Sequence, residues 1–361
     1  MTDGVRLLRF FLGANTPQGF VSRFDQLERE KDGWETHIIK GGPGSGKSTL
    51  MKRIARAAEG PGETVEEIYC SSDCGSLDGV IIHNRRFSVA DGTPPHLLEP
   101  KCPGAYDSIL NLCSCWNAEK LRARRGEIMA LSRRISSLHA QSTRFLSAYA
   151  ALAGENRMFA LECTDTEKIR EHAARLAARE MRRRSGHTPH EDIRFLSGIT
   201  DRGIFVFEET ARTLAERIYI IEDDCGAASR ILLFELRRLA LSRGYDIISC
   251  FCPVEPDEKL EHLFIPALSL GFMTSNRRHP LSLTPYRVLH ARRFTDTEAL
   301  RRHRQRLSFS RKMGAQMLEK SAACLKEAKA LHDELEAHYI AAMDFAALDS
   351  FAEKTIRELL G

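Results

Sequence analysis

The chain has 361 residues, enough for two domains, and its 43% hydrophobic content can fill sizeable cores. Charged residues make up 28% of the sequence and the formal net charge is +4, which argues against wholesale disorder and leaves the chain only mildly basic. The basic residues gather in short runs at 122–125, 182–184 and 301–306. Such runs can contact phosphate or nucleic acid, but on helices they more commonly form solvated faces. We therefore do not expect nucleic acid as the main partner, although the runs leave it open.

The N-terminal segment has a short apolar run broken by Arg9 and lacks the cleavage pattern of a signal peptide. No run reaches the roughly 18 to 20 apolar residues that a membrane helix needs. We therefore expect a cytoplasmic protein with no membrane partner. Its ten cysteines are expected to remain thiols, because their close pairs lack the C-x-x-C spacing of a zinc ribbon.

The most specific motif follows the first predicted strand, which covers His37–Ile39. Residues 41–48 read GGPGSGKS and match the phosphate-loop (Walker A) pattern G-x-x-x-x-G-K-[ST]. A helix with apolar Leu50, Met51 and Ile54 comes next, so the strand, loop and helix that the motif requires are all present. The residues predicted to bind nucleotide are Gly41, Gly42, Pro43, Gly44, Ser45, Gly46, Lys47, Ser48 and Thr49.

Each residue type in this motif has a physical role. The glycines allow backbone N–H groups to turn toward the phosphates, and the start of the helix adds its dipole. Lys47 is expected to place its positive charge against the β and γ phosphates of ATP, and the Ser48 hydroxyl is expected to coordinate Mg²⁺. The motif therefore predicts ATP and Mg²⁺ as ligands.

Two further strands are predicted to end in acidic residues. The strand Phe87–Ala90 leads into Asp91, which we interpret as the carboxylate on the metal side, with a turn aspartate as the alternative. The strand Val65–Cys70 is followed by Asp73 and Asp78, and Asp73 is the preferred catalytic candidate, although a helix cap fits equally well. His96 is a weaker third candidate. The sequence does not identify the catalytic base.

A long helical stretch follows. From Leu121 to Leu152, eight of ten positions at alternating spacings of three and four are Leu, Ile, Phe or Tyr, which is typical of a coiled-coil seam. We expect a break at Gly154 and a return helix at about 165–184. A looser seam runs from Leu300 to Phe345. These helices are expected to pack on each other or on a partner, such as a second copy in a homodimer.

The stretch IYIIEDDCGAASRILL at 218–233 admits two interpretations: a metal-carboxylate strand, or a phosphate loop without its lysine. Internal repetition favours the second. Ile220 lies 182 positions after Ile38 (220 − 38 = 182), and Gly226 lies the same distance after Gly44. Further pairs keep displacements of 182 to 184 from Phe11/Phe195 to His96/His279.

The substitutions in the second copy agree with one another. Ser229 and Arg230 stand at the positions of Lys47 and Ser48, and Thr274 stands near the position of Asp91. Asp223 and Asp224 replace Gly41 and Gly42 and place carboxylates where a phosphate would bind. We therefore predict that this copy is degenerate and binds no triphosphate.

Together these patterns predict an α/β protein with two tandem P-loop NTPase-like parallel-sheet domains, each followed by long helical, coiled-coil-like arms. The predicted boundaries are 1–120 for the active nucleotide-binding domain, 121–190 for a helical hairpin, 191–296 for the degenerate domain and 297–361 for the C-terminal helices.

The segments FLGANTPQGF, KGGPGSGKSTLMK, CSSDCGSLDGVII and DGTPPH, in this order, resemble a group of uncharacterised bacterial P-loop proteins. These are described as ATPases or as nucleotide-kinase-like, with an internally duplicated P-loop domain. The resemblance covers most of residues 8–120 and, more faintly, 194–300. It implies ATP binding without identifying a substrate, and the degenerate second copy limits the transfer to the first half.

Three functions remain open from the sequence. The first is an ATPase in which nucleotide moves the helices or the degenerate copy. The second is a small-molecule or nucleotide kinase, with Arg122, Arg124 and Arg125 closing as a lid on the transferred phosphate. The third is a scaffold that binds nucleotide for stability. We favour the ATPase, because the loop is specific for nucleotide and the sequence gives no acceptor.

Overall fold

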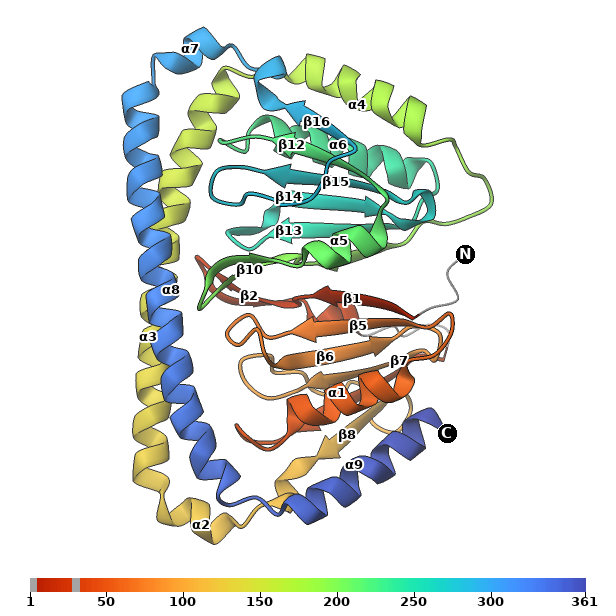
Figure 1. Cartoon of the computed structure of the whole chain (residues 1–361), viewed down its shortest axis with the longest axis vertical. Coiled ribbons are helices and arrows are strands. Elements are labelled where there is room, and N and C mark those ends of the chain that lie inside the picture. The colour runs from red at the N-terminus through yellow and green to blue at the C-terminus, as the bar shows by residue number, and fades with distance from the viewer. Residues whose placement is uncertain (1–4, 28–32) are drawn as a thin grey trace.

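The computed structural model describes residues 5–27 and 33–361. It is a mixed α/β structure in which two six-stranded sheets lie one above the other, beside a pair of long helices (Figure 1). All ten cysteines are free thiols. Among the described residues, no helix combines the length and apolar character needed to cross a bilayer.

The first sheet comes from the N-terminal part of the chain. In pairing order, its strands are β1 (Arg6–Phe10), β5 (Thr64–Tyr69), β6 (Leu77–Ile82), β7 (Phe87–Asp91), β4 (Glu35–Lys40) and β8 (Asp107–Asn111). Its other elements are the hairpin β2 (Gly13–Thr16) and β3 (Gly19–Ser22), the 3₁₀ turns η1 (Phe24–Leu27) and η2 (Leu112–Cys115), and helix α1 (Lys47–Ala58). The helix buries Leu50, Met51 and Ile54 against the sheet, because their spacing puts them on one face.

The second sheet repeats this arrangement. In the matching order, its strands are β9 (Glu191–Arg194), β13 (Ile247–Cys252), β14 (Glu255–Ile265), β15 (Leu270–Ser275), β12 (Arg217–Glu222) and β16 (Arg287–His290). Its other elements are β10 (Ser197–Thr200), β11 (Gly203–Val206), α5 (Glu208–Leu214), α6 (Ala228–Ser242), η3 (Pro266–Leu268) and η4 (Ala291–Phe294). Ile39 pairs with Asp91 in the first sheet, and Ile221 pairs with Thr274 in the second. The strand registers therefore match at the residues that the sequence repeat aligned.

The prediction of parallel sheets was wrong in part. β6 runs antiparallel to both β5 and β7, and β14 runs antiparallel to both β13 and β15. The connections around β6 are short turns, at residues 70–76 and 83–86, which cannot hold the crossover that parallel neighbours need. Asp78 therefore lies inside β6, near its beginning, rather than in a loop after β5.

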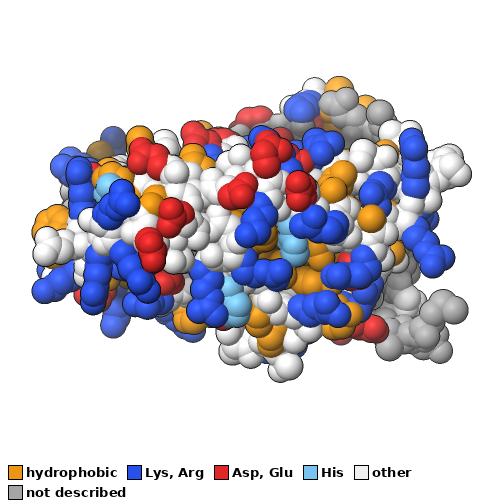
Figure 2. Space-filling view, turned by 90° about the horizontal axis from the view of Figure 1, so that it is seen from above, with side chains coloured by type: hydrophobic (Ala, Val, Ile, Leu, Met, Phe, Trp, Pro, Cys, Tyr) orange, Lys and Arg blue, Asp and Glu red, His pale blue; other side chains and the backbone are white. Residues whose placement is uncertain are grey.

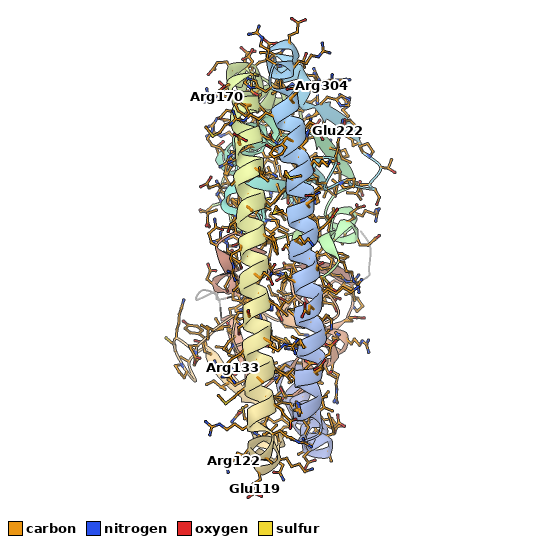
Figure 3. All side chains as sticks on the ribbon, turned by 90° about the vertical axis from the view of Figure 1, so that its left-hand side faces the viewer. Glu119, Arg122, Arg133, Arg170, Glu222 and Arg304 are labelled. Carbon is orange, nitrogen blue, oxygen red and sulfur yellow. The ribbon has the colours of Figure 1, made fainter. Side chains whose placement is uncertain are left out.

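The remaining helices come from two stretches of chain. These helices are α2 (Ala118–Ala123), α3 (Arg125–Glu162), α4 (Thr166–Glu180), α7 (Thr297–Arg301), α8 (Arg304–Ile340) and α9 (Phe345–Leu360). Helices α3 and α8 run in opposite directions, side by side, along both sheets (Figures 1 and 3). Leu146 of α3 and Leu325 of α8 are buried in a cluster that also contains Ile199 of β10.

The expected break at Gly154 was wrong. Helix α3 continues through Gly154 to Glu162, and the return helix α4 ends at Glu180. A glycine inside a helix costs only about 1 kcal/mol relative to alanine. Packing against α8 over the length of α3 outweighs that cost.

Helices α4 and α9, the last helix of each half, each pack on the opposite half. Helix α4 follows the first sheet in sequence but packs on α6 of the second, while α9 packs on α1 of the first (Figure 1). Matching backbone hydrogen bonds hold the beginning of each of these two helices. Asp165 N, before α4, donates to Phe294 O, and Asp344 N, before α9, donates to Cys115 O, each at 2.7 Å. Each sheet is therefore covered in part by a helix from the other half.

The two halves meet around an approximate two-fold relation. Phe11 and Phe195, equivalent in the repeat, form a reciprocal pair of backbone hydrogen bonds. The hydroxyls of Ser142 on α3 and Ser321 on α8 are both buried and lie 2.8 Å apart. Ser142 and Ser321 are separated by 321 − 142 = 179 residues, the same offset as the starts of α3 and α8 (304 − 125 = 179). Equivalent residues thus contact each other where the halves meet.

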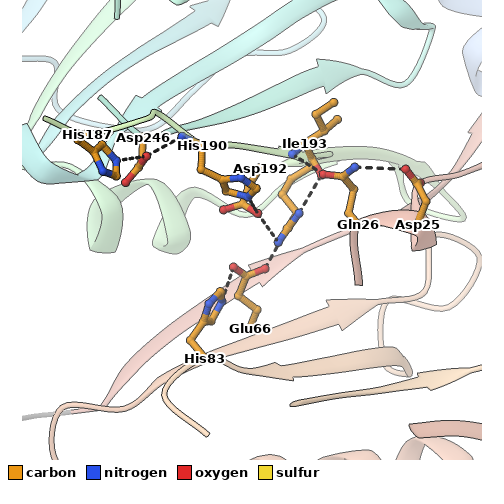
Figure 4. A network of polar contacts seen from close by, with 10 residues as sticks. Asp25, Gln26, Glu66, His83, His187, His190, Asp192, Ile193 and Asp246 are labelled. Atoms are coloured by element: carbon orange, nitrogen blue, oxygen red, sulfur yellow. Dashed lines mark hydrogen bonds and ion pairs between the residues drawn. The ribbon is translucent and has the colours of Figure 1, made fainter. Parts of the chain in front are cut away.

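A buried ion pair also joins the halves (Figure 4). The fully buried Arg194 donates from Nε to Glu66 Oε2 at 2.9 Å, and His83 Nε2 lies 2.8 Å from the other carboxylate oxygen. Burial acts to raise the pKa of Glu66, but Arg194 and His83 outweigh it and hold this pKa below its usual value. Beside this ion pair, the backbone N–H of Ile193 donates to Gln26 Oε1 at 3.1 Å.

Candidate functional site

The first loop, residues 41–46, connects β4 to α1. Gly44 and Gly46 have φ angles of 64° and 84°, in the left-handed region that favours glycine. A Cβ added to Gly41 would lie 2.5 Å from the Ser45 hydroxyl, so the Ser45 side chain would have to move. The glycines are therefore required by the conformation of the loop and by its close contacts.

Lys47 begins α1 and folds back over the first loop. Its Nζ donates to the carbonyl oxygens of Gly41 and Gly42, at 3.1 and 2.8 Å. The same nitrogen lies 3.6 Å from Asp91 Oδ2 at the end of β7, with both side chains largely buried. The structure thus brings together the lysine and the carboxylate that the sequence predicted, 44 residues apart (91 − 47 = 44).

The side-chain oxygen atoms of Ser48 and Asp91 are both held by neighbouring groups. The Ser48 hydroxyl accepts a hydrogen bond from Leu77 N at 2.9 Å, at the beginning of β6. Asp91 Oδ1 accepts from both the amide and the hydroxyl of Thr93, at 2.8 and 2.6 Å. Asp91 therefore forms a turn with one oxygen and faces Lys47 with the other. Of the other predicted residues, Pro43 is half-buried in the first loop and Thr49 is exposed on α1.

A second acidic residue faces a histidine nearby. Asp78 Oδ2 lies 3.2 Å from His96 Nε2, and both side chains are buried. Burial lowers the pKa of His96, but the carboxylates of Asp78 and then Asp91 outweigh it, so this pKa lies above its usual value. Lys40 holds the segment that carries His96, donating from Nζ to Gly92 O and Leu98 O at 2.8 and 2.9 Å.

Asp73 lies in the turn between β5 and β6. Its carboxylate accepts from Gly75 N at 3.0 Å and from the Ser76 hydroxyl at 2.8 Å, and lies 3.6 Å from Lys329 Nζ of α8. Burial raises the pKa of Asp73, but these hydrogen bonds and Lys329 more than offset it and keep the pKa below its usual value. The contacts of Asp73 are those of a turn residue. The helix-cap alternative was wrong, because strand β6 and not a helix follows Asp73.

Helix α8 covers the first loop. Glu336 Oε1 accepts a hydrogen bond from Gly44 N at 3.2 Å. A Cβ on Gly42 would lie 2.5 Å from the Tyr339 ring and 3.2 Å from Trp116. Sequence analysis missed Glu336, because it is 292 residues from Gly44 and no local pattern marks it. Only the packing of the end of α8 against the first half brings Glu336 to the loop.

The second loop, residues 223–227, connects β12 to α6. Asp223 Oδ1 accepts from Cys225 N and Gly226 N, at 3.1 and 2.9 Å, and its Oδ2 accepts from Ser229 N at 2.9 Å. One side chain thus occupies three amides of the loop and the first turn of α6. The neighbouring Asp224 pairs instead with Arg277 Nε, at 3.2 Å.

Arg230 also has a fixed partner. Its guanidinium lies 2.6 Å from Glu255 and 3.1 Å from Glu258. Glu255 also pairs with Arg157 of α3. Arg157 is the equivalent of Glu336, because both helices have the same offset (336 − 157 = 179). The helix residue over the second loop is therefore cationic, where the residue over the first loop is acidic.

The arginines of two basic runs, 122–125 and 301–306, are exposed. Arg122, Arg124 and Arg125 are exposed around the start of α3, where Arg124 pairs with Glu127 at 3.0 Å (Figure 3). Arg301, Arg302 and Arg304 are exposed around α7. Figure 2 shows lysine and arginine side chains spread, with acidic ones among them, over the face that is seen from above.

Comparisons with known proteins give no identity. No family model, no curated protein and no solved structure matches the chain.

Proposed function

We propose that the first loop binds Mg·ATP and that the N-terminal half hydrolyses it. The observation that carries this proposal is the meeting of Lys47 and Asp91, 3.6 Å apart, beside a loop that requires glycine. A compact cation, a buried carboxylate and a helix N-terminus suit a nucleotide triphosphate with its metal.

The donor set fits magnesium. Ser48 and Asp91 offer a hydroxyl and a carboxylate oxygen, and Mg²⁺ prefers oxygen ligands while it keeps several waters. Mg²⁺ would neutralise charge on the β and γ phosphates. Lys47 would turn from the carbonyl oxygens of Gly41 and Gly42 toward the phosphates, since those carbonyls are weaker partners for an ammonium group than an anion is.

Binding would couple to the long helices through Glu336. A phosphate oxygen and the Glu336 carboxylate both accept from backbone amides, so they compete for Gly44 N. Two anions in one site also repel each other. ATP would therefore displace the part of α8 around Glu336. The other end of the same helix lies beside the second sheet. We infer that nucleotide shifts α8 relative to the first loop, in an ATPase that moves its helices.

No observation favours the kinase. The three arginines proposed as its lid are exposed around the start of α3, where Arg124 pairs with Glu127. The nucleotide-stabilised scaffold differs from the ATPase only in turnover, so turnover is the measurement to make. The resemblance to P-loop ATPases and nucleotide-kinase-like proteins remains an expectation from the sequence motifs.

The test is phosphate release from ATP by the full chain, with and without a panel of nucleosides and nucleotides. Mg²⁺-dependent release without an acceptor supports the ATPase. ATP consumption only with an acceptor present would overturn it in favour of a kinase, and binding without turnover would favour the scaffold. Lys47→Ala is the control for contaminating activity.

A further inference from the structure

A cavity of about 100 Å³ lies beside the second loop. Its walls come from the loops after β12 and β15, from β14, and from both long helices. The site is outside the carboxyl ends of β12 and β15, which is where open α/β sheets bind ligands. The volume has room for several water molecules, and hence for a small polar ligand, but not for a nucleotide triphosphate.

The acidic residues that line this cavity already have partners. Asp223 accepts from three backbone amides, and Glu255 pairs with Arg157 and Arg230. Glu261 is fully engaged, with Lys259 at 3.2 Å from one oxygen and the Ser197 hydroxyl at 2.5 Å from the other. The negative charge of the cavity is therefore compensated within the protein.

Two arginines that line the cavity carry positive charges that are not paired with a carboxylate. Arg278 and Arg311 both line it, and neither forms an ion pair with a carboxylate in the described part of the chain. Arg278 donates to Arg311 O at 2.8 Å and lies over the ring of Tyr149, at 5.1 Å from its centroid. These contacts hold one guanidinium in place while leaving its charge unpaired.

Two buried polar side chains also lack hydrogen-bond partners here. Asn156 of α3 and His279 after β15 are 5% and 4% exposed, and both line the cavity. Asn156 Oδ1 and both ring nitrogens of His279 have no partner among the described residues. Buried polar groups without partners are costly, so a ligand or water must satisfy them. Burial lowers the pKa of His279, which keeps the ring neutral, with one N–H to donate.

We propose that this cavity binds a small oxyanion, the carboxylate or phosphate group of a small molecule, through Arg278 and Arg311. Asp223 excludes a triphosphate by occupying the loop amides, so the anion is bound by side chains instead. The repeat supports a site particular to this half. The positions equivalent to Arg278 and Arg311 hold Pro95 (278 − 183 = 95) and Ser132 (311 − 179 = 132). The copy that lost the lysine thus carries two arginines that the first copy lacks.

The test uses Lys47→Ala protein, so that the first loop contributes little to anion binding. Inorganic phosphate and acetate are titrated separately by calorimetry into this protein. The same titrations are made with Arg278→Gln and Arg311→Gln added, and with Arg304→Gln as a control of equal charge change on an exposed site. We expect saturable binding of at least one anion, weakened at least tenfold by the cavity changes and unchanged by Arg304→Gln.

The two anions distinguish the sources of the ligand. Tighter phosphate binding indicates a phosphorylated molecule, and tighter acetate binding indicates a carboxylic acid. The proposal is overturned if neither anion binds to folded Lys47→Ala protein, or if the cavity changes leave binding intact. ATP binding by chains that retain Lys47 is measured with the same arginine changes. It should be unaltered, so that failure of this proposal is separable from failure of the ATP site.

Discussion

The first and second loops have the same place in sheets of the same strand order but differ in what occupies their amides. In the first loop, Gly44 N meets Glu336, a carboxylate from a distant helix. In the second, the amides meet Asp223, a carboxylate within the loop itself. A carboxylate on another helix can be displaced by an anion, whereas one fixed beside the amides competes at very high effective concentration. Under the proposed function, sheets of the same strand order would hold an exchangeable ligand in one half and a permanent internal contact in the other.

The largest effect, a loss of folding stability, is expected from a change to the buried ion pair that joins the halves. Glu66→Gln removes a charge with little change in volume and leaves Arg194 buried beside an incomplete set of partners. Breaking a buried pair costs about 3 to 5 kcal/mol. Denaturant unfolding at pH 7 should show this loss in a single transition if the halves unfold together. Exposed Glu209→Gln is the control.

The same pair predicts a pH dependence. The pKa of Glu66 is lowered by folding, so its contribution is present above the unfolded pKa, near 4.5, and is lost as the pH falls through the folded value. The difference in free energy of unfolding between wild type and Glu66→Gln should therefore be largest at pH 7 and shrink below pH 4.5. A difference that is constant over this range would contradict the assignment.

Lys47→Ala should reduce ATP turnover by about 100-fold to 1,000-fold, because the loop has no other side-chain cation for the β and γ phosphates. The matched change in the second half, Ser229→Ala, should leave turnover unchanged. Phosphate release under saturating Mg·ATP measures both. Equal losses in the two variants would remove the functional distinction between the loops.

Asp91→Asn should lower Mg²⁺-dependent turnover by about 10-fold to 100-fold while the protein stays folded, since the amide still accepts from Thr93 but no longer carries charge. Asp73→Asn tests the other candidate. Its turn contacts predict a smaller effect. If Asp73→Asn proves the more damaging of the two in the turnover assay, the roles must be exchanged.

Asp223→Ala leaves three amides without their acceptor and should destabilise the protein by about 1 to 3 kcal/mol. It should not create a second ATP site, because the positions of Lys47 and Asp91 hold Ser229 and Thr274 in the second half, which carry neither a cation nor a carboxylate. Calorimetry should still give one ATP per chain. A stoichiometry of two would show that a single carboxylate was all that kept ATP from the second loop.

The smallest effect is expected at Glu336. Glu336→Gln removes the competing charge, and a net hydrogen-bond contribution of about 0.5 to 1.5 kcal/mol predicts ATP affinity about twofold to twelvefold higher. Glu334→Gln, exposed on the same helix, is the control. Unchanged or weaker binding in Glu336→Gln would mean that the carboxylate does not compete with ATP.

The sequence alone determined the features that depend on local spacing. A strand, a glycine loop and the helix after them are predicted from neighbouring residues, because their conformations follow from nearby side chains. The repeat fixed the equivalence of Asp91 and Thr274, which the strand registers reproduce. Strand and helix lengths set that spacing, so it survives in the second copy despite the changed residues.

Only the tertiary structure decided the direction of β6 and β14, the exchange of α4 and α9, and the contacts of Glu336 and Arg194. Each depends on residues far apart in sequence, and chain periodicity does not specify which distant surfaces meet. The pairing of Asp78 with His96 is of the same kind, since it required β6 to run against its neighbours. The conformation of the first loop thus follows from nearby residues, whereas the residue that contacts its amides is determined by long-range packing.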